Sequence, residues 1–188
     1  MNRRDAIAAI GWIMGGTMIG AEFLVSCTNS SPKVNKLFDQ DQVTFLDEVG
    51  ETIIPTTDSP GAKAAKIGAF MATMVQDCYT PEDQKIFLKG ISQLDDASKK
   101  KFDKKFLEAT AQERTALLNQ LDKDQKNHQV NKKEDAPNHY FRMMKELTML
   151  GYFTSEVGAT QALRYLPVPG RYEGCMPYKK GEKAWAIT

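Results

Sequence analysis

The residues that could perform acid–base or metal chemistry are few and widely spaced in this sequence of 188 residues. The chain contains two histidines, His128 and His139, and neither has a cluster of cysteines or carboxylates at metal-ligand spacing beside it. Adjacent carboxylates such as Asp95 and Asp96 could act as a general acid and base, but exposed helix faces carry such pairs constantly. The sequence also lacks a G-x-S-x-G nucleophile elbow, a glycine-rich dinucleotide loop and a Cys-x-x-Cys-His haem motif. We therefore predict no catalytic, metal-binding or cofactor-binding residue on this chain.

Cys27 has the most specific predicted chemistry, because it follows an N-terminal export signal. Arg3 and Arg4 provide a basic start, and residues 6–21 are then free of charge. That run is shorter than the roughly 20 apolar residues of a membrane-spanning helix, and it is typical of a signal peptide over residues 1–26. The four residues ending at Cys27 (LVSC) resemble a bacterial lipobox, so we predict that Cys27 becomes an acylated N-terminus. A signal anchor with an incidental cysteine is the alternative.

The same segment bears on the route and destination of export. The adjacent arginines resemble a twin-arginine signal, but the usual Phe-Leu does not follow them, so twin-arginine and general secretory export both remain open. We expect the mature chain on the periplasmic face of a bacterial cell envelope, as a lipid-anchored membrane protein. The polar residues after the cysteine predict a flexible tether over 27–36, followed by one helical domain over 37–188.

Two further cysteines, Cys78 and Cys175, remain in the predicted mature chain. Disulfides persist in exported proteins, so an even pair of cysteines predicts a bond between them. Such a bond would close a loop of about 97 residues. The lost entropy of the unfolded chain would stabilise the fold by on the order of 4 kcal/mol if native strain is small. The alternative is a pair of buried free thiols.

Composition and charge describe an ordinary globular chain. Lys and Arg number 25 against 24 Asp and Glu, which gives a net charge of +1, and 41% of the residues are hydrophobic. Nucleic-acid binding by bulk electrostatics is not expected, because it needs a strongly basic surface. The length fits one domain.

Helix start signals recur along the chain, and no segment alternates polar and apolar residues as a half-buried strand would. Asp39, Thr80 and Thr110 are typical N-terminal caps. The polar interval 122–138 is predicted to be a linker or an exposed turn. The fold class is therefore all-α, an irregular bundle of five to seven short helices. The apolar spacing predicts these helices over residues 39–53, 62–77, 80–94, 98–107, 110–121 and 137–151.

The C-terminal third has a different composition. Residues 151–178 contain five aromatic residues, four glycines and three prolines, which are too many for one regular helix. We predict a short helix over 154–163 and then an extended arm over 165–178. Aromatic and Arg side chains supply much contact area per residue, which favours an arm that lies on a partner protein. The alternative is an arm that folds back over its own helices.

Three stretches of the sequence carry a resemblance to a known family. They are ETIIPTTDSPGA at 51–62, DCYTPED at 77–83, and GYFTSEVG with YLPVPGRY at 151–158 and 165–172. On these motifs the chain is similar to the gluconate 2-dehydrogenase subunit 3 family, the small subunits of membrane-associated flavoprotein dehydrogenases. The terminal stretch is the most specific of the three. An N-terminal export signal is also common in that family.

The resemblance implies a role in a complex and no reaction on this chain. It implies a large partner subunit of the glucose-methanol-choline oxidoreductase type, which binds FAD and oxidises a sugar or polyol. It also implies a cytochrome c partner, whose haem c accepts the electrons. The small subunit would support export, folding and stability of the large one. A stand-alone envelope lipoprotein, acting as a ligand-binding or scaffold module, is the alternative function.

Within this role, residues 152–178 of the C-terminal arm (151–188) are the predicted contact with the large subunit. Arg171 is the single residue that we expect to contribute most, and a salt bridge within its own chain is the alternative for it. The full set of predicted interface residues is Tyr152, Phe153, Glu156, Arg164, Tyr165, Pro167, Pro169, Arg171 and Tyr172.

Overall fold

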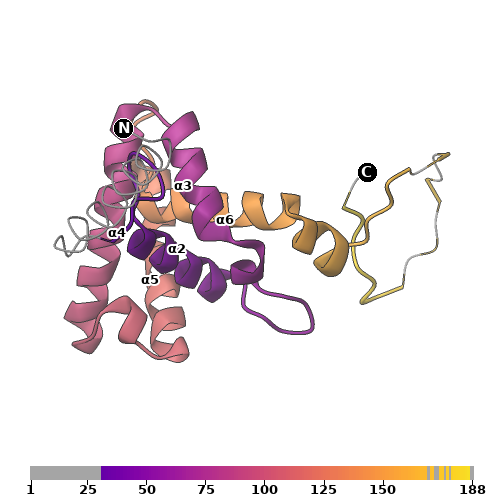
Figure 1. Cartoon of the computed structure of the whole chain (residues 1–188), viewed down its shortest axis with the longest axis horizontal. Helices are drawn as coiled ribbons and strands as arrows, with labels where there is room; N and C mark the ends of the chain where they lie inside the picture. Colours follow the sequence, from indigo (N-terminus) through magenta and orange to yellow (C-terminus); the bar gives the residue numbers. More distant parts are fainter. Residues whose placement is uncertain (1–30, 169, 172–173, 176, 178, 187–188) are drawn as a thin grey trace, which may run out of the picture. The chain divides into compact units, whose positions relative to one another are not determined.

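The computed structural model of the chain describes residues 31–168, 170–171, 174–175, 177 and 179–186. Within these residues it contains helices and two isolated β-bridges but no strand (Figure 1). The predicted all-α, irregular bundle is confirmed. The predicted signal segment 1–26 and Cys27 lie outside the described residues. In chain order the elements are α2 (Gln40–Ile53), the 3-10 turn η1 (Ala62–Ala65), α3 (Ile67–Cys78), α4 (Pro81–Phe102), the 3-10 turn η2 (Phe106–Glu108), α5 (Ala111–Asn131), α6 (Tyr140–Thr154) and the π-helical turn η3 (Gly158–Ala162).

Three helices begin at the caps that the sequence predicts. Asp39 caps α2 by accepting the Gln42 backbone N–H at 2.8 Å, and the Gln42 side chain accepts the Asp39 N–H in return. The hydroxyl oxygens of Thr80 and Thr110 accept backbone N–H groups at the starts of α4 and α5. These caps satisfy amides for which the helix itself supplies no acceptor.

The other four α-helices all pack against α6. Element contacts join α6 to α2, α3, α4 and α5, and Phe141, Met144 and Leu147 lie on its buried face. α4 approaches α6 closely at Gly90, where an added Cβ would lie 2.5 Å from the Cβ of Tyr140. No side chain fits at that distance, so the glycine allows the close packing of α4 on α6.

The hydrophobic core lies where these helices meet. Burying a large aliphatic or aromatic side chain contributes roughly 1.5–3 kcal/mol relative to leaving it in water. The largest fully buried side chains come from α2, α3, α4, α6, η2 and the segment before α2, and they form one cluster with Leu117, Leu118 and Leu121 of α5. They are Phe38, Leu46, Val49, Ile67, Met71, Val75, Phe87, Leu94, Phe106, Phe141, Met144 and Tyr152.

The compact unit begins at Lys33, so the end of the predicted tether already belongs to the helical body. The side-chain amide of Asn35 donates to the carbonyl of Ala72 in α3 at 2.9 Å, and its Oδ1 accepts the Phe38 N–H at 2.8 Å. A polar residue such as Asn can fix a turn as well as extend a spacer. The tether predicted over 27–36 therefore ends earlier than its sequence indicates.

α5 extends through most of the polar interval that the sequence predicts to be a linker. It continues to Asn131, beyond Leu121. Asp122 supports this extension by pairing with Lys126 one turn later at 2.8 Å and with Lys145 of α6 at 2.6 Å. The hydrogen bonds from Lys126 and Lys145 lower the pKa of Asp122 to about 2. Good helix formers joined by such pairs continue a helix without apolar residues.

α4 and α6 also extend beyond their predicted ends. α4 passes through the fully buried Ser98 to Phe102, so the separate helix predicted over 98–107 does not form. α6 begins at Tyr140 and passes through Gly151 to Thr154. An added Cβ on Gly151 would lie 2.5 Å from the Phe70 ring, so this glycine permits close packing on α3 instead of ending the helix.

Candidate functional site

The C-terminal half of α6 has two different faces. Gly151 and Tyr152 are buried in the body, whereas Met149, Leu150 and Phe153 are exposed. Helical residues three and four positions apart share a face, so the exposed residues form an apolar stripe along the end of the helix. A surface helix normally turns such a stripe toward its own core.

Tyr152 joins the end of α6 to the loop between α2 and η1. Its side chain is 1% exposed, and its hydroxyl donates a hydrogen bond to the carbonyl of Pro60. Glu51 holds the same loop from α2, because its carboxylate accepts the Thr56 hydroxyl at 2.7 Å and the Lys63 backbone N–H at 2.9 Å. The motif stretches 51–62 and 151–158 therefore meet at one end of the helical body.

The π-helical turn η3 redirects the chain after α6. The Ser155 hydroxyl donates to the Tyr152 carbonyl at 2.7 Å and accepts the Gly158 N–H at 3.0 Å. An added Cβ on Gly158 would lie 1.9 Å from the carbonyl oxygen of Tyr152. Only glycine tolerates so close a backbone approach, and Gly158 therefore fixes the direction in which the chain leaves α6.

The C-terminal segment closes on itself. The Arg164 N–H donates to the Ala184 carbonyl at 2.8 Å, and the Arg164 carbonyl accepts the Ala186 N–H at 2.7 Å. The Arg164 guanidinium lies over the Trp185 ring, 4.2 Å from its centroid. Contacts made beyond residue 178, the end of the predicted arm, therefore bring the chain back to Arg164. We call residues 164–186 the C-terminal loop.

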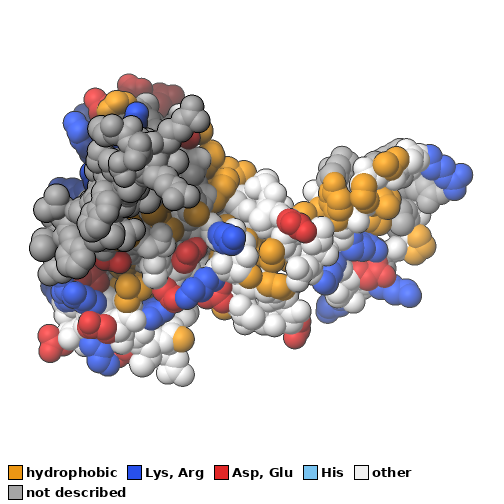
Figure 2. All heavy atoms as spheres, viewed as in Figure 1, with side chains coloured by type: hydrophobic (Ala, Val, Ile, Leu, Met, Phe, Trp, Pro, Cys, Tyr) orange, Lys and Arg blue, Asp and Glu red, His pale blue; other side chains and the backbone are white. Residues whose placement is uncertain are grey.

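Exposed apolar side chains gather on the end of α6 and the C-terminal loop. Among the described residues, ten large hydrophobic side chains are exposed, and seven of them lie on these two segments. Figure 2 shows hydrophobic side chains gathered on the surface of the C-terminal loop. Single exposed apolar residues are ordinary, but a concentration of them is typical of an interaction surface. We call these seven the exposed apolar group. They are Met149, Leu150, Phe153, Tyr165, Leu166, Val168 and Trp185.

Comparison with known proteins assigns the chain to a family. A family model described as gluconate 2-dehydrogenase subunit 3 matches residues 40–170. The chain belongs to the gluconate 2-dehydrogenase subunit 3 family. No curated protein and no solved structure gives a significant match. The matched span runs from the start of α2 into the C-terminal loop, and it includes six of the seven residues of the exposed apolar group.

Membership of the gluconate 2-dehydrogenase subunit 3 family indicates an accessory subunit of a dehydrogenase complex. The family is associated with membrane-bound complexes of this kind. In the part of the chain that the structure describes, no helix is both long enough and apolar enough to cross a membrane.

The structure places the predicted interface residues in different environments. Tyr152 requires a correction, because it is buried in the core and bonded to Pro60. Arg164 is half-buried at the base of the C-terminal loop. Pro169 and Tyr172 lie outside the described residues. The remaining predicted interface residues are exposed, and they are Phe153, Glu156, Tyr165, Pro167 and Arg171.

The exposed apolar group also includes residues that the sequence does not single out. Met149 and Leu150 precede Gly151, which the sequence predicts to end the helix; an α6 that continues to Thr154 gives these residues a face of their own. The signal for them is the spacing of 149, 150 and 153, which falls on the side opposite 144, 148 and 151. Leu166, Val168 and Trp185 carry no comparable local signal, since their exposure depends on how the C-terminal loop closes.

Cys78 and Cys175 are both free and exposed in the structure, so the disulfide predicted between them is not formed there. Cys78 ends α3, whereas Ile67 at the start of α3 lies beside Gly151 of α6. A helix of 12 residues is about 18 Å long. The end of α6 therefore lies beside the start of α3, and Cys78 lies at the other end of α3. The alternative of buried thiols also differs from the structure.

The charged residues of the helical body join its segments to one another. Arg114 of α5 donates to the Glu48 carboxylate of α2 at 2.7 Å and to three backbone carbonyls at and after η2. A hydrogen bond from Lys63, together with Arg114, lowers the pKa of Glu48. Burial raises the pKa of the neighbouring Asp47, whose Oδ1 accepts the Gly68 N–H at 2.7 Å. These carboxylates therefore have structural partners at the helix junctions.

The two histidines lie near each other at the start of α6. His139 caps this helix, because its Nδ1 accepts the Phe141 backbone N–H at 3.2 Å. Its ring stacks on Tyr140 with centroids 4.5 Å apart and lies 5.8 Å from the His128 ring. Burial lowers the pKa of His139 and raises the pKa of Tyr140 to about 12. Within the described ranges, no group of three or more His, Cys, Asp or Glu side chains could hold a metal ion.

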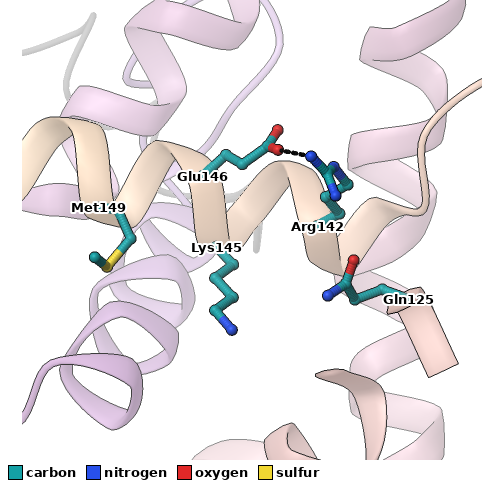
Figure 3. Close-up of a pocket in the computed structure, with 5 residues that line it drawn as sticks. All are labelled: Gln125, Arg142, Lys145, Glu146 and Met149. Atoms are coloured by element: carbon teal, nitrogen blue, oxygen red, sulfur yellow. Dashed lines mark ion pairs between the residues drawn. The ribbon is translucent and has the colours of Figure 1, made fainter. Parts of the chain in front are cut away.

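A shallow hollow of about 360 Å³ lies between α5 and α6 (Figure 3). Arg142 pairs with Glu146 at 2.7 Å, and Lys145 pairs with Asp122 at 2.6 Å. These opposite charges neutralise one another, so we assign the hollow no ligand of its own. Its lining residues are Gln125 from α5 and Arg142, Lys145, Glu146 and Met149 from α6.

Proposed function

We propose that this chain is the small, non-catalytic accessory subunit of an exported dehydrogenase, and that the end of α6 and the C-terminal loop bind the large subunit. The observation that carries this proposal is the exposed apolar group, which a chain acting alone would be expected to bury. Family membership supports a role inside a dehydrogenase complex.

The size of the exposed apolar group is appropriate for a stable contact. Fully burying one large apolar side chain contributes roughly 1.5–3 kcal/mol, whereas association costs an estimated 4–15 kcal/mol in lost freedom of motion. Seven partly exposed side chains can offset that cost only if most of them are covered together. The proposal therefore requires α6 and the C-terminal loop to dock on one partner at the same time.

The partner in this proposal is a glucose-methanol-choline type oxidoreductase that binds FAD and oxidises a sugar or polyol. A cytochrome c with haem c accepts the electrons. The small subunit supports export, folding and stability of the flavoprotein. A stand-alone ligand-binding or scaffold lipoprotein would instead copurify without a flavoprotein.

The proposal also includes tethering of the complex at the periplasmic face of the membrane. The uncharged run over 6–21 and the lipobox-like residues before Cys27 support export and acylation. A lipid on Cys27 would hold the small subunit, and the large subunit through it. Cys27→Ser should move flavin-linked dehydrogenase activity from the membrane fraction to the soluble periplasm, and activity that stays in the membrane would argue against this anchor.

The interface is tested with two matched substitutions of exposed aliphatic residues. The full chain is co-expressed with its large subunit, which carries the affinity tag, and the small chain and flavin are quantified in the purified complex. Leu150→Asp on α6 should reduce the copurifying small chain by about tenfold or more, because it places a charge in an apolar contact. Val130→Asp on α5, at a residue 84% exposed, should leave it unchanged.

The two variants also show which result would contradict the proposal. Thermal melting of each full-length small chain, followed by circular dichroism, establishes that both variants fold. A folded Leu150→Asp chain that copurifies as well as wild type would overturn the assignment of the α6 stripe as an interface.

A further inference from the structure

The base of the C-terminal loop is held closed by contacts that involve its two ends. Two backbone hydrogen bonds join Arg164 to Ala184 and Ala186. The Arg164 guanidinium stacks on Trp185 and lies 3.8 Å from the Glu182 carboxylate. We call this set of contacts the Arg164–Trp185 clasp. A cation stacked on tryptophan is stabilising even at exposed sites, so the loop has a defined base before any partner binds.

A second contact fixes the loop to the turn that precedes it. The Lys183 ammonium donates to the carbonyl of Gln161 in η3. Since Gly158 fixes the direction of η3 relative to α6, the loop continues from the end of α6 through a constrained turn. The apolar residues Tyr165 and Leu166 directly follow the clasp. The two halves of the exposed apolar group therefore lie on α6 and on a loop that η3 joins to it.

The C-terminal loop also differs from the rest of the chain in charge. Residues 164–186 contain five Lys or Arg residues and two Glu residues, a net charge of +3. The whole chain has 25 Lys or Arg residues and 24 Asp or Glu residues. The chain outside the loop therefore has 20 Lys or Arg against 22 Asp or Glu, a net charge of −2. The near-neutral total therefore conceals a cationic segment, and a charge asymmetry of this kind indicates a surface that meets an acidic one.

We propose that the C-terminal loop is preformed by the Arg164–Trp185 clasp and docks its lysines and apolar residues on an acidic, apolar surface of the dehydrogenase large subunit. This inference rests on the proposed function and adds to it the chemistry of the partner surface and the residue pair that positions the loop. The occupant is a protein surface, because both the loop and the end of α6 expose large apolar side chains and the family acts within a complex.

Charge and preformation contribute to binding in different ways. Complementary charges speed the encounter of two proteins, and salt weakens this effect because the screening length is about 8 Å at physiological ionic strength. A loop that is already closed loses less conformational freedom on binding, so the complex is tighter for the same contacts. The two contributions are therefore separable by substitutions at the lysines and at the clasp.

The charge contribution is tested by reversing one adjacent pair of exposed lysines. Lys179→Glu with Lys180→Glu should weaken binding to the purified large subunit by about tenfold at low salt and should flatten the dependence of affinity on salt. The matched control is Lys100→Glu with Lys101→Glu, an adjacent exposed pair on α4. The control should bind within about twofold of wild type, because charges away from the interface are screened.

The clasp is tested through Arg164 and Trp185. Trp185→Ala should weaken binding by about tenfold, whereas Trp185→Phe should retain most of the affinity, since phenylalanine can still stack under a guanidinium. The sequence contains one other tryptophan, Trp12. In a Trp12→Phe background, Trp185 fluorescence should shift to longer wavelength on Arg164→Ala, which reports an opened clasp directly.

The combined results distinguish this inference from the proposed function. If Leu150→Asp abolishes the complex but the charge-reversed and Trp185→Ala chains bind as wild type does, the inference fails and the proposed interface on α6 stands. If Leu150→Asp has no effect, the proposed function itself fails. Binding of the wild-type and charge-reversed chains to vesicles of phosphatidylcholine and phosphatidylglycerol is measured as well. Loss of vesicle binding on charge reversal, with an unchanged complex, would identify a membrane surface as the occupant and overturn the inference.

Discussion

The helical body and the C-terminal region use the same kinds of side chain for different purposes. In the body, large apolar residues are buried and carboxylates such as Glu48 and Asp47 join neighbouring segments. From Met149 onward, Tyr152 is buried but seven other large apolar residues are exposed, and Arg164 holds a loop closed by stacking on Trp185. Under the proposed function, the body supplies stability and the C-terminal region supplies recognition. Substitutions in the two regions should therefore separate unfolding free energy from complex formation.

The largest expected difference comes from truncating one apolar side chain in each region. Phe87→Ala in the core should lower the free energy of unfolding by about 3–5 kcal/mol, because it removes buried contacts and leaves a cavity. Val168→Ala, at a residue 79% exposed, should change it by less than about 0.5 kcal/mol. Urea unfolding of the two full-length variants measures both values. Similar losses of unfolding free energy for Phe87→Ala and Val168→Ala would show that the two regions contribute equally to stability.

Charged residues give the next comparison. The Arg114 side chain is 18% exposed, and its guanidinium donates to Glu48 and to three backbone carbonyls. Arg114→Ala should therefore lower the free energy of unfolding by about 2–3 kcal/mol. Arg114→Lys should recover little of that, since an ammonium cannot reproduce the fork of donors. Arg142→Ala removes an exposed pair with Glu146 and should cost less than about 1 kcal/mol. Urea unfolding measures both variants. Equal losses of unfolding free energy for Arg114→Ala and Arg142→Ala would show that the contacts of Arg114 stabilise the fold no more than an exposed ion pair does.

The smallest expected effect is a dependence of stability on pH at the start of α6. Burial lowers the pKa of His139 from its usual value of 6.5, and His128 and Asp124 of α5 are the charged groups that act on it. As the pH falls through 6.5, the unfolded chain takes up a proton before the folded chain does, so the unfolding free energy decreases. His139 therefore makes its full contribution to the unfolding free energy only above pH 6.5.

The control for this pH effect keeps the helix cap but removes the titration. His139→Asn retains an acceptor for the Phe141 N–H, since Asn is a strong N-cap. Its unfolding free energy should fall less than that of wild type between neutral and mildly acidic pH. An unaltered pH dependence in this variant would assign the effect to other groups.

Helix starts are predicted well from the sequence, because the contacts that fix them lie within a few residues of one another. Asp39, Thr80 and Thr110 cap their helices through amides only three residues away, so a short window contains the whole interaction. The family resemblance in the motif stretches is confirmed by the family match over 40–170. Both kinds of signal are readable without knowing which helices are neighbours in space.

The differences arise where distant residues decide the outcome. The polar half of α5 is supported by Lys145 of α6, and Tyr152 is buried because it reaches the Pro60 carbonyl. Closure of the C-terminal loop depends on contacts between Arg164 and residues near the end of the chain. An aromatic residue at position 152 predicts contact area but not whether the contact is internal or with a partner. The candidate site is therefore only partly predictable from sequence.

Hydrogen exchange on the purified complex would show directly which residues of the small chain contact the large subunit. Backbone amides of the free full-length small chain are compared with those of the same chain bound to its large subunit. We predict that new protection is concentrated at residues 149–153, 165–168 and 179–186, with little change along α4 and α5. Protection that appears on α4 or α5, with the end of α6 and the C-terminal loop unchanged, would contradict the division between a stabilising body and a recognising C-terminal region.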